Sequence, residues 1–244
     1  MKNILVCFFV LITNVAAGQT IQGMDKAIEL LNKSGKVFAS GNMSMDVYYT
    51  YANEHQPDVL IDSLKGTIQL SGTNYRSELG NTLSVKNSRY SIIVFKEDKL
   101  LYVAGTGVAD STAGTSPVLL ITTAIKQMGV KECNVTTHKD TTTIRFLFPE
   151  NMTYRYMDIK MENRSGRIQE IQYVVKSTMI DQENTGGIVF EPYALVRTFF
   201  RYHDNVSVAA SVFDEQQFFT RSANTLVPAA AYSNYEVFIG TPSN

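Results

Sequence analysis

Hydrophobic and polar positions follow two different periods along this chain. Between residues 24 and 39 the apolar positions recur at helical spacing, and the run ends at Ser40, Gly41 and Asn42. This pattern predicts an amphipathic helix with charged residues on its other side. The apolar face of that helix holds Met24, Ala27, Ile28, Leu31, Gly35 and Phe38. From residue 45 onward the period shortens to the two-residue alternation of β-strands.

Strand patterns dominate the rest of the chain, because short runs of aromatic and β-branched residues alternate with turn residues. We expect strands at 45–51, 66–70, 75–79, 90–95, 100–103, 142–148, 153–161, 168–177, 195–203, 206–213 and 235–239, and a short helical turn at 214–220. In the run 142–148, Ile144, Phe146 and Phe148 share one face. Short strands joined by tight turns indicate an antiparallel meander.

A second helix interrupts the strands. Residues 105–116 are rich in Gly, Ser, Thr and Ala, which is typical of a loop. Ser116 as N-cap, Pro117 in the first turn and Gly129 just past the end then predict a helix between them. Its apolar face holds Pro117, Ile121, Ala124, Ile125 and Met128. We expect the two helices to cover the inner face of one long sheet, since so aromatic a sheet cannot leave both faces in water.

The first 18 residues have the order of a secretory signal peptide. Lys2 precedes an apolar run from Ile4 to Ile12, and the small residues 16–18 follow. Cleavage is expected after Ala17 or after Gly18, and a buried N-terminal strand is the alternative. We therefore expect an exported, periplasmic protein that is not lipidated, because Cys7 lies inside the apolar run. No later apolar run approaches the roughly 20 residues that cross a bilayer, so we expect a soluble, not membrane-spanning, mature chain.

Composition narrows the function. The 244 residues are 44% hydrophobic, with 22 Lys and Arg against 23 Asp and Glu. This composition argues against a disordered chain and against a nucleic-acid partner. The 26 aromatic residues comprise 13 Phe and 13 Tyr without Trp. Neither a repeat nor a change of composition marks a second domain.

Motifs for catalysis are weak. The three histidines, His55, His138 and His203, are far apart, and no zinc or dinucleotide motif is present, so we expect no metal and no cofactor. Asp158 and Lys160 share one strand face, which favours a solvated edge over an acid–base pair. An enzyme is therefore disfavoured.

Two further residues that could be nucleophiles have structural interpretations. Ser116 is better explained as a helix cap than as the serine of a nucleophile elbow, because Pro117 follows it and Val118 replaces the last glycine. Cys133, alone after removal of the first 18 residues, is interpreted as a small buried hydrophobe, with a nucleophile as the alternative.

Several segments carry a resemblance. They are Gly66–Leu70 leading to Tyr75-Arg76, the hairpin Ile92–Tyr102, the helix entry Thr115–Ile121, and the late segments Tyr154–Ile159, Arg164–Ile168 and Ile171–Val175. Their order, between an N-terminal helix and further strands, resembles the periplasmic lipoprotein carriers of the LolA/LolB type. The chain departs from that family's pattern: Tyr75 and Tyr102 stand near expected tryptophans, Ser71-Gly72 replaces Arg-Pro, and the segment after about Thr220 exceeds the usual plan.

The resemblance implies a mainly β (α+β) fold: an open antiparallel β half-barrel covered by the N-terminal helix and a lid-like second helix. It implies a single domain over 19–244, with a C-terminal extension after about 220. It also implies a groove whose lining is expected to include Tyr49, Ile68, Leu70, Tyr75, Val94, Leu101, Phe146, Phe148, Ile159, Ile171 and Tyr173, under a lid helix carrying Val118, Ile121 and Ile125.

Two functions follow from this resemblance. The first is a soluble cell-envelope carrier that binds the acyl chains of lipoproteins or other lipids by apolar contact. The second is a non-catalytic binding or assembly component of an envelope complex, with the same fold and a filled groove. Envelope proteins would be its partners, and the apolar patches between Ala223 and Asn244 motivate it.

Overall fold

The computed structural model describes residues 21–39, 42–106, 117–180, 191–204, 206–222 and 225–240. The helices are α1 (Met24–Ala39) and α2 (Pro117–Met128), and the short 3-10 turns are η1 (Ser177–Met179), η2 (Ala210–Phe213), η3 (Glu215–Gln217) and η4 (Ala230–Tyr232). The strands are β1 (Met43–Asn53), β2 (Gln56–Ser71), β3 (Asn74–Leu79), β4 (Thr82–Lys86), β5 (Tyr90–Phe95), β6 (Leu100–Gly105), β7 (Glu132–His138), β8 (Thr141–Leu147), β9 (Tyr154–Glu162), β10 (Ile168–Lys176), β11 (Tyr193–His203), β12 (Phe219–Ser222), β13 (Thr225–Pro228) and β14 (Glu236–Gly240). The expected signal peptide and Ser116 lie outside the described residues.

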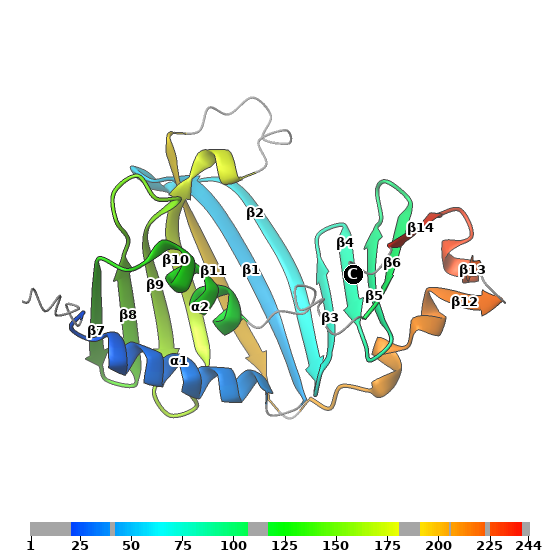
Figure 1. Ribbon diagram of the computed structural model, residues 1–244, viewed down its shortest axis with the longest axis horizontal. Coiled ribbons are helices and arrows are strands. Elements are labelled where there is room, and N and C mark those ends of the chain that lie inside the picture. The colour runs from blue at the N-terminus through cyan, green and yellow to red at the C-terminus, as the bar shows by residue number, and fades with distance from the viewer. Residues whose placement is uncertain are drawn as a thin grey trace, which may run out of the picture.

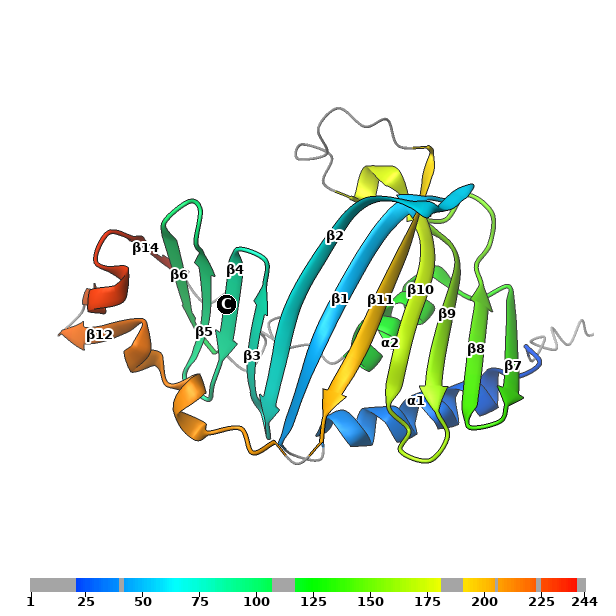
Figure 2. The same cartoon turned by 180° about the vertical axis from the view of Figure 1, so that it is seen from behind.

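Twelve strands form one open sheet in the order β14-β6-β5-β4-β3-β2-β1-β11-β10-β9-β8-β7 (Figure 1). Both helices lie over one side of it, which we call the front face; Figure 2 shows the opposite side, the back face, with strands passing in front of α1. The predicted fold, a mainly β protein with an open antiparallel sheet and two covering helices, is confirmed. One pairing differs, because β14 runs parallel to β6.

The helix boundaries agree with the sequence prediction. Gly129 ends α2 with a φ of +68°, and its N–H donates to the Ile125 carbonyl at 3.1 Å. The face of α1 differs at one position, because Ile28 is 47% exposed whereas Leu31 and Phe38 are buried. Ile28 therefore lies outside the stripe that packs on the sheet.

The strand prediction is wrong in one place and incomplete in others. The segment 206–213 is not a strand: it ends in the turn η2, and its Val208 and Phe213 side chains enter a hydrophobic core. This segment is held by the burial of its apolar side chains and not by backbone hydrogen bonds to any described strand. Strands β4, β7, β12 and β13 were not expected; β7 is an edge strand with mostly exposed side chains, so its sequence lacks a long apolar run.

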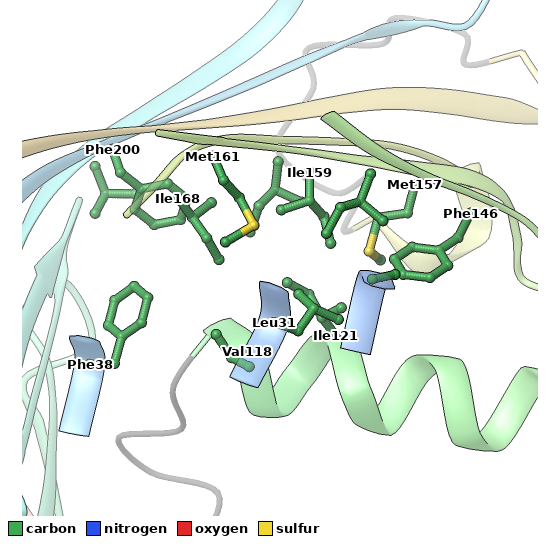
Figure 3. Packing of buried hydrophobic residues seen from close by; sticks show 14 of the residues in the cluster. Leu31, Phe38, Val118, Ile121, Phe146, Met157, Ile159, Met161, Ile168 and Phe200 are labelled. Atoms are coloured by element: carbon green, nitrogen blue, oxygen red, sulfur yellow. The ribbon is translucent and has the colours of Figure 1, made fainter. Parts of the chain in front are cut away.

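A first hydrophobic core lies between the two helices and the front face. Figure 3 shows Leu31 of α1 and Val118 and Ile121 of α2 facing apolar side chains of the sheet. The sheet contributes Phe146, Met157, Ile159, Met161, Ile168 and Phe200, all labelled in that view. Cys133 belongs to the same core and is 1% exposed, as expected of a small buried hydrophobe.

A second hydrophobic core lies on the back face of β4–β6. Cross-strand partners project to the same side of a sheet. Ile68, in the front-face core, pairs with Ser77, Ser77 with Ser84, and Ser84 with Ile93. Because neighbouring residues on a strand alternate, Val94 next to Ile93 faces the back. The second core on this side comprises Leu83, Val85, Ile92, Val94, Leu101 and Val103 together with Val208, Phe213, Phe218 and Phe219.

The C-terminal segment therefore forms part of the fold. In Figures 1 and 2 it passes along the bottom of the view, below the ends of β2 and β3, and then past β4–β6. Strand β14 finally joins the edge of the sheet beside β6. Polar contacts hold it in place: the Asn87 amide donates to the Phe213 carbonyl at 3.0 Å and to the Glu215 carboxylate at 2.7 Å. The parallel pairing of β14 follows from this return path.

Candidate functional site: a pocket under the second helix

A pocket of about 480 Å³ lies between α2 and the front face, within the roughly 300–1,000 Å³ of typical ligand sites. Its floor consists of side chains from four neighbouring strands: Tyr49 of β1, Thr198 and Phe200 of β11, Ile171 and Tyr173 of β10, and Tyr154 and Met157 of β9. Helix α2 supplies Ile121, Thr123, Gln127 and Met128, while Thr153 and the exposed Met179 of η1 complete the lining.

The register of the sheet explains which side chains reach the pocket. Tyr49 pairs with Thr198, Thr198 with Ile171, and Ile171 with Ile159, so these residues form one row across four strands. Tyr173 pairs with Met157 in the next row on the same face. Cross-strand partners share a face, so the floor is a set of aligned rows.

The described residues of the lining carry no formal charge. They are tyrosine, threonine, glutamine and apolar side chains, with no Asp, Glu, Lys, Arg or His among them. Burial, followed by the nearby phenols of Tyr75 and Tyr51, raises the pKa of Tyr49 to about 12. Burial likewise raises the pKa of Tyr173 and of Tyr154 above the ordinary value for tyrosine. All three phenols are thus neutral at physiological pH.

Four of the residues predicted for the groove and lid line this pocket: Tyr49, Ile171, Tyr173 and Ile121. The other residues predicted on the same side belong to the surrounding core without lining the pocket; they are Ile68, Leu70, Tyr75, Phe146, Phe148, Ile159, Val118 and Ile125. Whether any of them contacts a ligand stays a prediction.

The structure places Val94 and Leu101 elsewhere. They pair with each other across β5 and β6, both are 0% exposed, and they belong to the second core on the back face. These two residues therefore lie on the side of the sheet away from the pocket. Alternation along a strand predicts two faces but leaves open which one the helices cover.

Sequence reasoning did not single out Thr198 and Phe200. They lie in the predicted strand 195–203, and Thr198 is 4% exposed. Their signal was the alternation Val196, Thr198, Phe200 along that strand, which marks one face of β11. That face could be assigned to the pocket only through the pairing of Thr198 with Tyr49 and Ile171.

Three of the residues considered for catalysis, Asp158, His203 and His55, lie in separate ion pairs. Asp158 binds Arg145 through two hydrogen bonds of 2.6 and 2.5 Å, and His203 lies 2.9 Å from Asp46. His55 contacts Glu191 at 2.7 Å. Within the described ranges, no group of three or more His, Cys, Asp or Glu side chains could hold a metal ion.

No protein-family model matches the sequence, and a search of curated proteins finds no match either. Among solved structures, the chain is similar to an uncharacterized conserved protein from Thermus thermophilus, with 7% identity and a TM-score of 0.46 over 88% of this chain and 99% of that one. It is also similar to a LolA superfamily protein from Nitrosomonas europaea, with 10% identity and a TM-score of 0.34 over 78% and 98% of the two chains. Lipoprotein LppX from Mycobacterium tuberculosis aligns with 11% identity and a TM-score of 0.36 over 76% and 100%.

One of these matches is a LolA superfamily protein, the type of protein that the sequence motifs resemble. With identities of 11% or less and TM-scores below 0.5, these matches say nothing about a ligand, which has to be argued from the pocket itself.

In the part of the chain that the structure describes, no helix has both the length and the apolar character needed to cross a membrane.

Proposed function

We propose that this protein is a soluble cell-envelope carrier that binds the acyl chains of lipoproteins or other lipids. The observation that carries the proposal is the pocket of about 480 Å³ between α2 and the sheet, whose described lining residues are all uncharged. An acyl chain needs apolar surface rather than a charged anchor, and each Å² removed from water contributes about 25 cal/mol. Aromatic and methionine side chains suit a flexible chain, because they give wide contact and adapt to irregular shapes.

The position of the pocket under α2 also favours a carrier function. Helix α2 supplies one wall of the pocket, and α1 and α2 contact each other over the front face. Among the described elements, the short helix α2 would therefore cover a ligand in the pocket. Movement of that helix would open the site without disturbing the twelve-stranded sheet.

Blocking the pocket tests the proposal. Thr198→Trp would place an indole in the pocket, whereas Phe199→Trp changes the next residue, which faces the back and is 37% exposed. We expect the protein to take up a fluorescent acyl probe, Thr198→Trp to lose most of that uptake, and Phe199→Trp to retain it. Native mass spectrometry of protein purified from its own envelope fraction should show bound lipid. Absence of both bound lipid and probe uptake would contradict the carrier function.

Export is part of the same proposal. Cleavage after Ala17 or Gly18 would release a mature periplasmic chain, and N-terminal sequencing of the envelope protein would detect the new end. Recovery of the chain with an intact Met1 from the cytoplasm would contradict it.

A second candidate is an assembly role through the edge strand β14. Phe238 and Ile239 are 47% and 61% exposed on the outermost strand of the sheet. Exposed apolar edge strands favour pairing with another chain. Phe238→Lys with Ile239→Lys should abolish capture of an envelope partner under this alternative and leave acyl-probe uptake unchanged. Truncation after Thr220 is less suitable, because Leu226, Tyr232, Tyr235 and Val237 pack against the second core.

A further inference from the structure

Three tyrosines from three strands meet at the floor of the pocket. Tyr49 lies on β1, Tyr173 on β10 and Tyr154 on β9. The rings of Tyr154 and Tyr173 contact each other edge to face, with centroids 5.4 Å apart. Burial and then the neighbouring phenols of Tyr154, Tyr51 and Tyr49 raise the pKa of Tyr173. Tyr49, Tyr154 and Tyr173 all line the same pocket.

No hydrogen bond joins the hydroxyls of Tyr49, Tyr154 or Tyr173 to another described residue, whereas two other tyrosines of this sheet have protein partners. Tyr202 donates to the Ile168 carbonyl at 2.9 Å, and the Tyr156 hydroxyl accepts from the Gln172 amide at 3.3 Å. These hydroxyls are not fully buried, because Ser34 Oγ is the only buried side-chain N or O atom without a partner among the described residues. Water can therefore reach them in the open pocket, and a ligand that displaces that water has to replace its hydrogen bonds. The pocket therefore presents phenol donors that lack an acceptor from the protein.

The chemistry of the lining selects among lipids. A hydrocarbon would leave the phenol donors unpaired. A carboxylate would accept from them, but it would lose its hydration next to lining residues that, in the described part of the chain, include no Lys, Arg or His. An ester or amide carbonyl is an uncharged acceptor with two lone pairs, so it satisfies the donors without bringing in a charge.

We infer that the pocket binds an acyl chain through its ester or amide carbonyl, with the hydroxyls of Tyr49 and Tyr173 donating to the carbonyl oxygen. This inference rests on the proposed carrier function and names its ligand class: neutral acyl esters or amides rather than free fatty acids. The chain itself would lie along the apolar side chains Ile171, Met157 and Phe200.

The experiment compares three ligands with the same alkyl chain in delipidated full-length protein at neutral pH: a methyl ester, the free fatty acid and the alkane. Displacement of a fluorescent acyl probe gives their affinities. We expect the ester to bind more tightly than either of the others, by about two- to tenfold for each hydrogen bond gained. Ester and alkane of equal affinity, or a fatty acid that binds more tightly than the ester, would overturn the inference.

Hydroxyl deletions identify the donors. Tyr49→Phe and Tyr173→Phe should each reduce ester affinity by about two- to tenfold and leave alkane affinity unchanged, because only the hydroxyl is removed. Tyr202→Phe is the matched control, since its hydroxyl already has a protein partner. Unchanged ester affinity in both test variants would overturn the assignment.

The outcomes separate this inference from the carrier function. If none of the three ligands displaces the probe, both are contradicted. If all three bind equally, the carrier function stands and the carbonyl contact does not. Thermal unfolding of the variants checks that they are folded, and an unpartnered hydroxyl should be removable without loss of stability.

Discussion

Arg89 and Glu215, 126 positions apart in the chain, form an ion pair that fastens the C-terminal segment to the sheet. Glu215 is only 7% exposed and also accepts from the Asn87 amide, whereas the Arg89 side chain remains 65% exposed. The carboxylate is therefore the buried member of this contact, and its removal affects the packing of η2 and η3 on the back face.

Glu215→Ala should lower the free energy of unfolding by about 1–3 kcal/mol, because the Asn87 amide loses a buried charged acceptor. Urea denaturation followed by circular dichroism measures the change. The exposed Glu150 provides the control, and Glu150→Ala should have little effect. Equal stability of the two variants would show that the ion pair does not hold the segment.

Phe219→Ala tests the second core. Phe219 is 2% exposed, and its ring meets that of Tyr90 edge to face at 5.2 Å. We expect a loss of about 3–5 kcal/mol, which is typical of truncating a buried aromatic residue. Phe238→Ala removes the same ring from a half-exposed position in β14, so it should cost much less in the same assay. Similar losses in the two variants would contradict the assignment of Phe219 to a core.

Gly66 is required by a close approach of two strands. A Cβ atom at this position would lie 2.9 Å from Cα of Leu79 and would also meet the Glu78 carbonyl. Gly66→Ala should therefore force β2 and β3 apart and lower the free energy of unfolding by about 1–3 kcal/mol. Gly105→Ala is the control, since the added methyl would meet open space. A thermal melt in which both variants match the parent would refute the close approach.

Alkaline pH should destabilise the protein through its buried tyrosines. The pKa of Tyr49 rises from 10.0 to about 12 on folding, so the unfolded chain loses its proton first. Stability from this group is complete below pH 10 and falls as pH rises toward 12, because the folded state binds more protons there.

Ultraviolet titration of tyrosinate checks this pH effect. The Tyr49→Phe variant should lose one of the late-titrating phenols and show a shallower fall in urea midpoint between pH 10 and 12. A Tyr49 that titrates near 10 in the folded protein would contradict its burial.

Local patterns in the sequence determined the secondary structure that surrounds the site. The spacing of Leu31 and Phe38 marked α1, and Pro117 and Gly129 bounded α2, because helix periodicity and end signals depend only on neighbouring residues. Alternation in 142–148 likewise placed Phe146 and Ile144 on one buried face.

Tertiary structure alone decided which buried face holds the pocket. Val94 and Tyr49 both follow strand alternation, yet Val94 lies under the returning C-terminal segment and Tyr49 under α2. Alternation defines two faces of a strand but does not show which segment packs on each face. The segment that covers Val94 lies more than a hundred residues away in the sequence, and the helix that covers Tyr49 lies more than sixty residues away. The site therefore depends on long-range packing and on the pairing of Tyr49 with Thr198. Neither can be predicted from the periodicity of neighbouring residues.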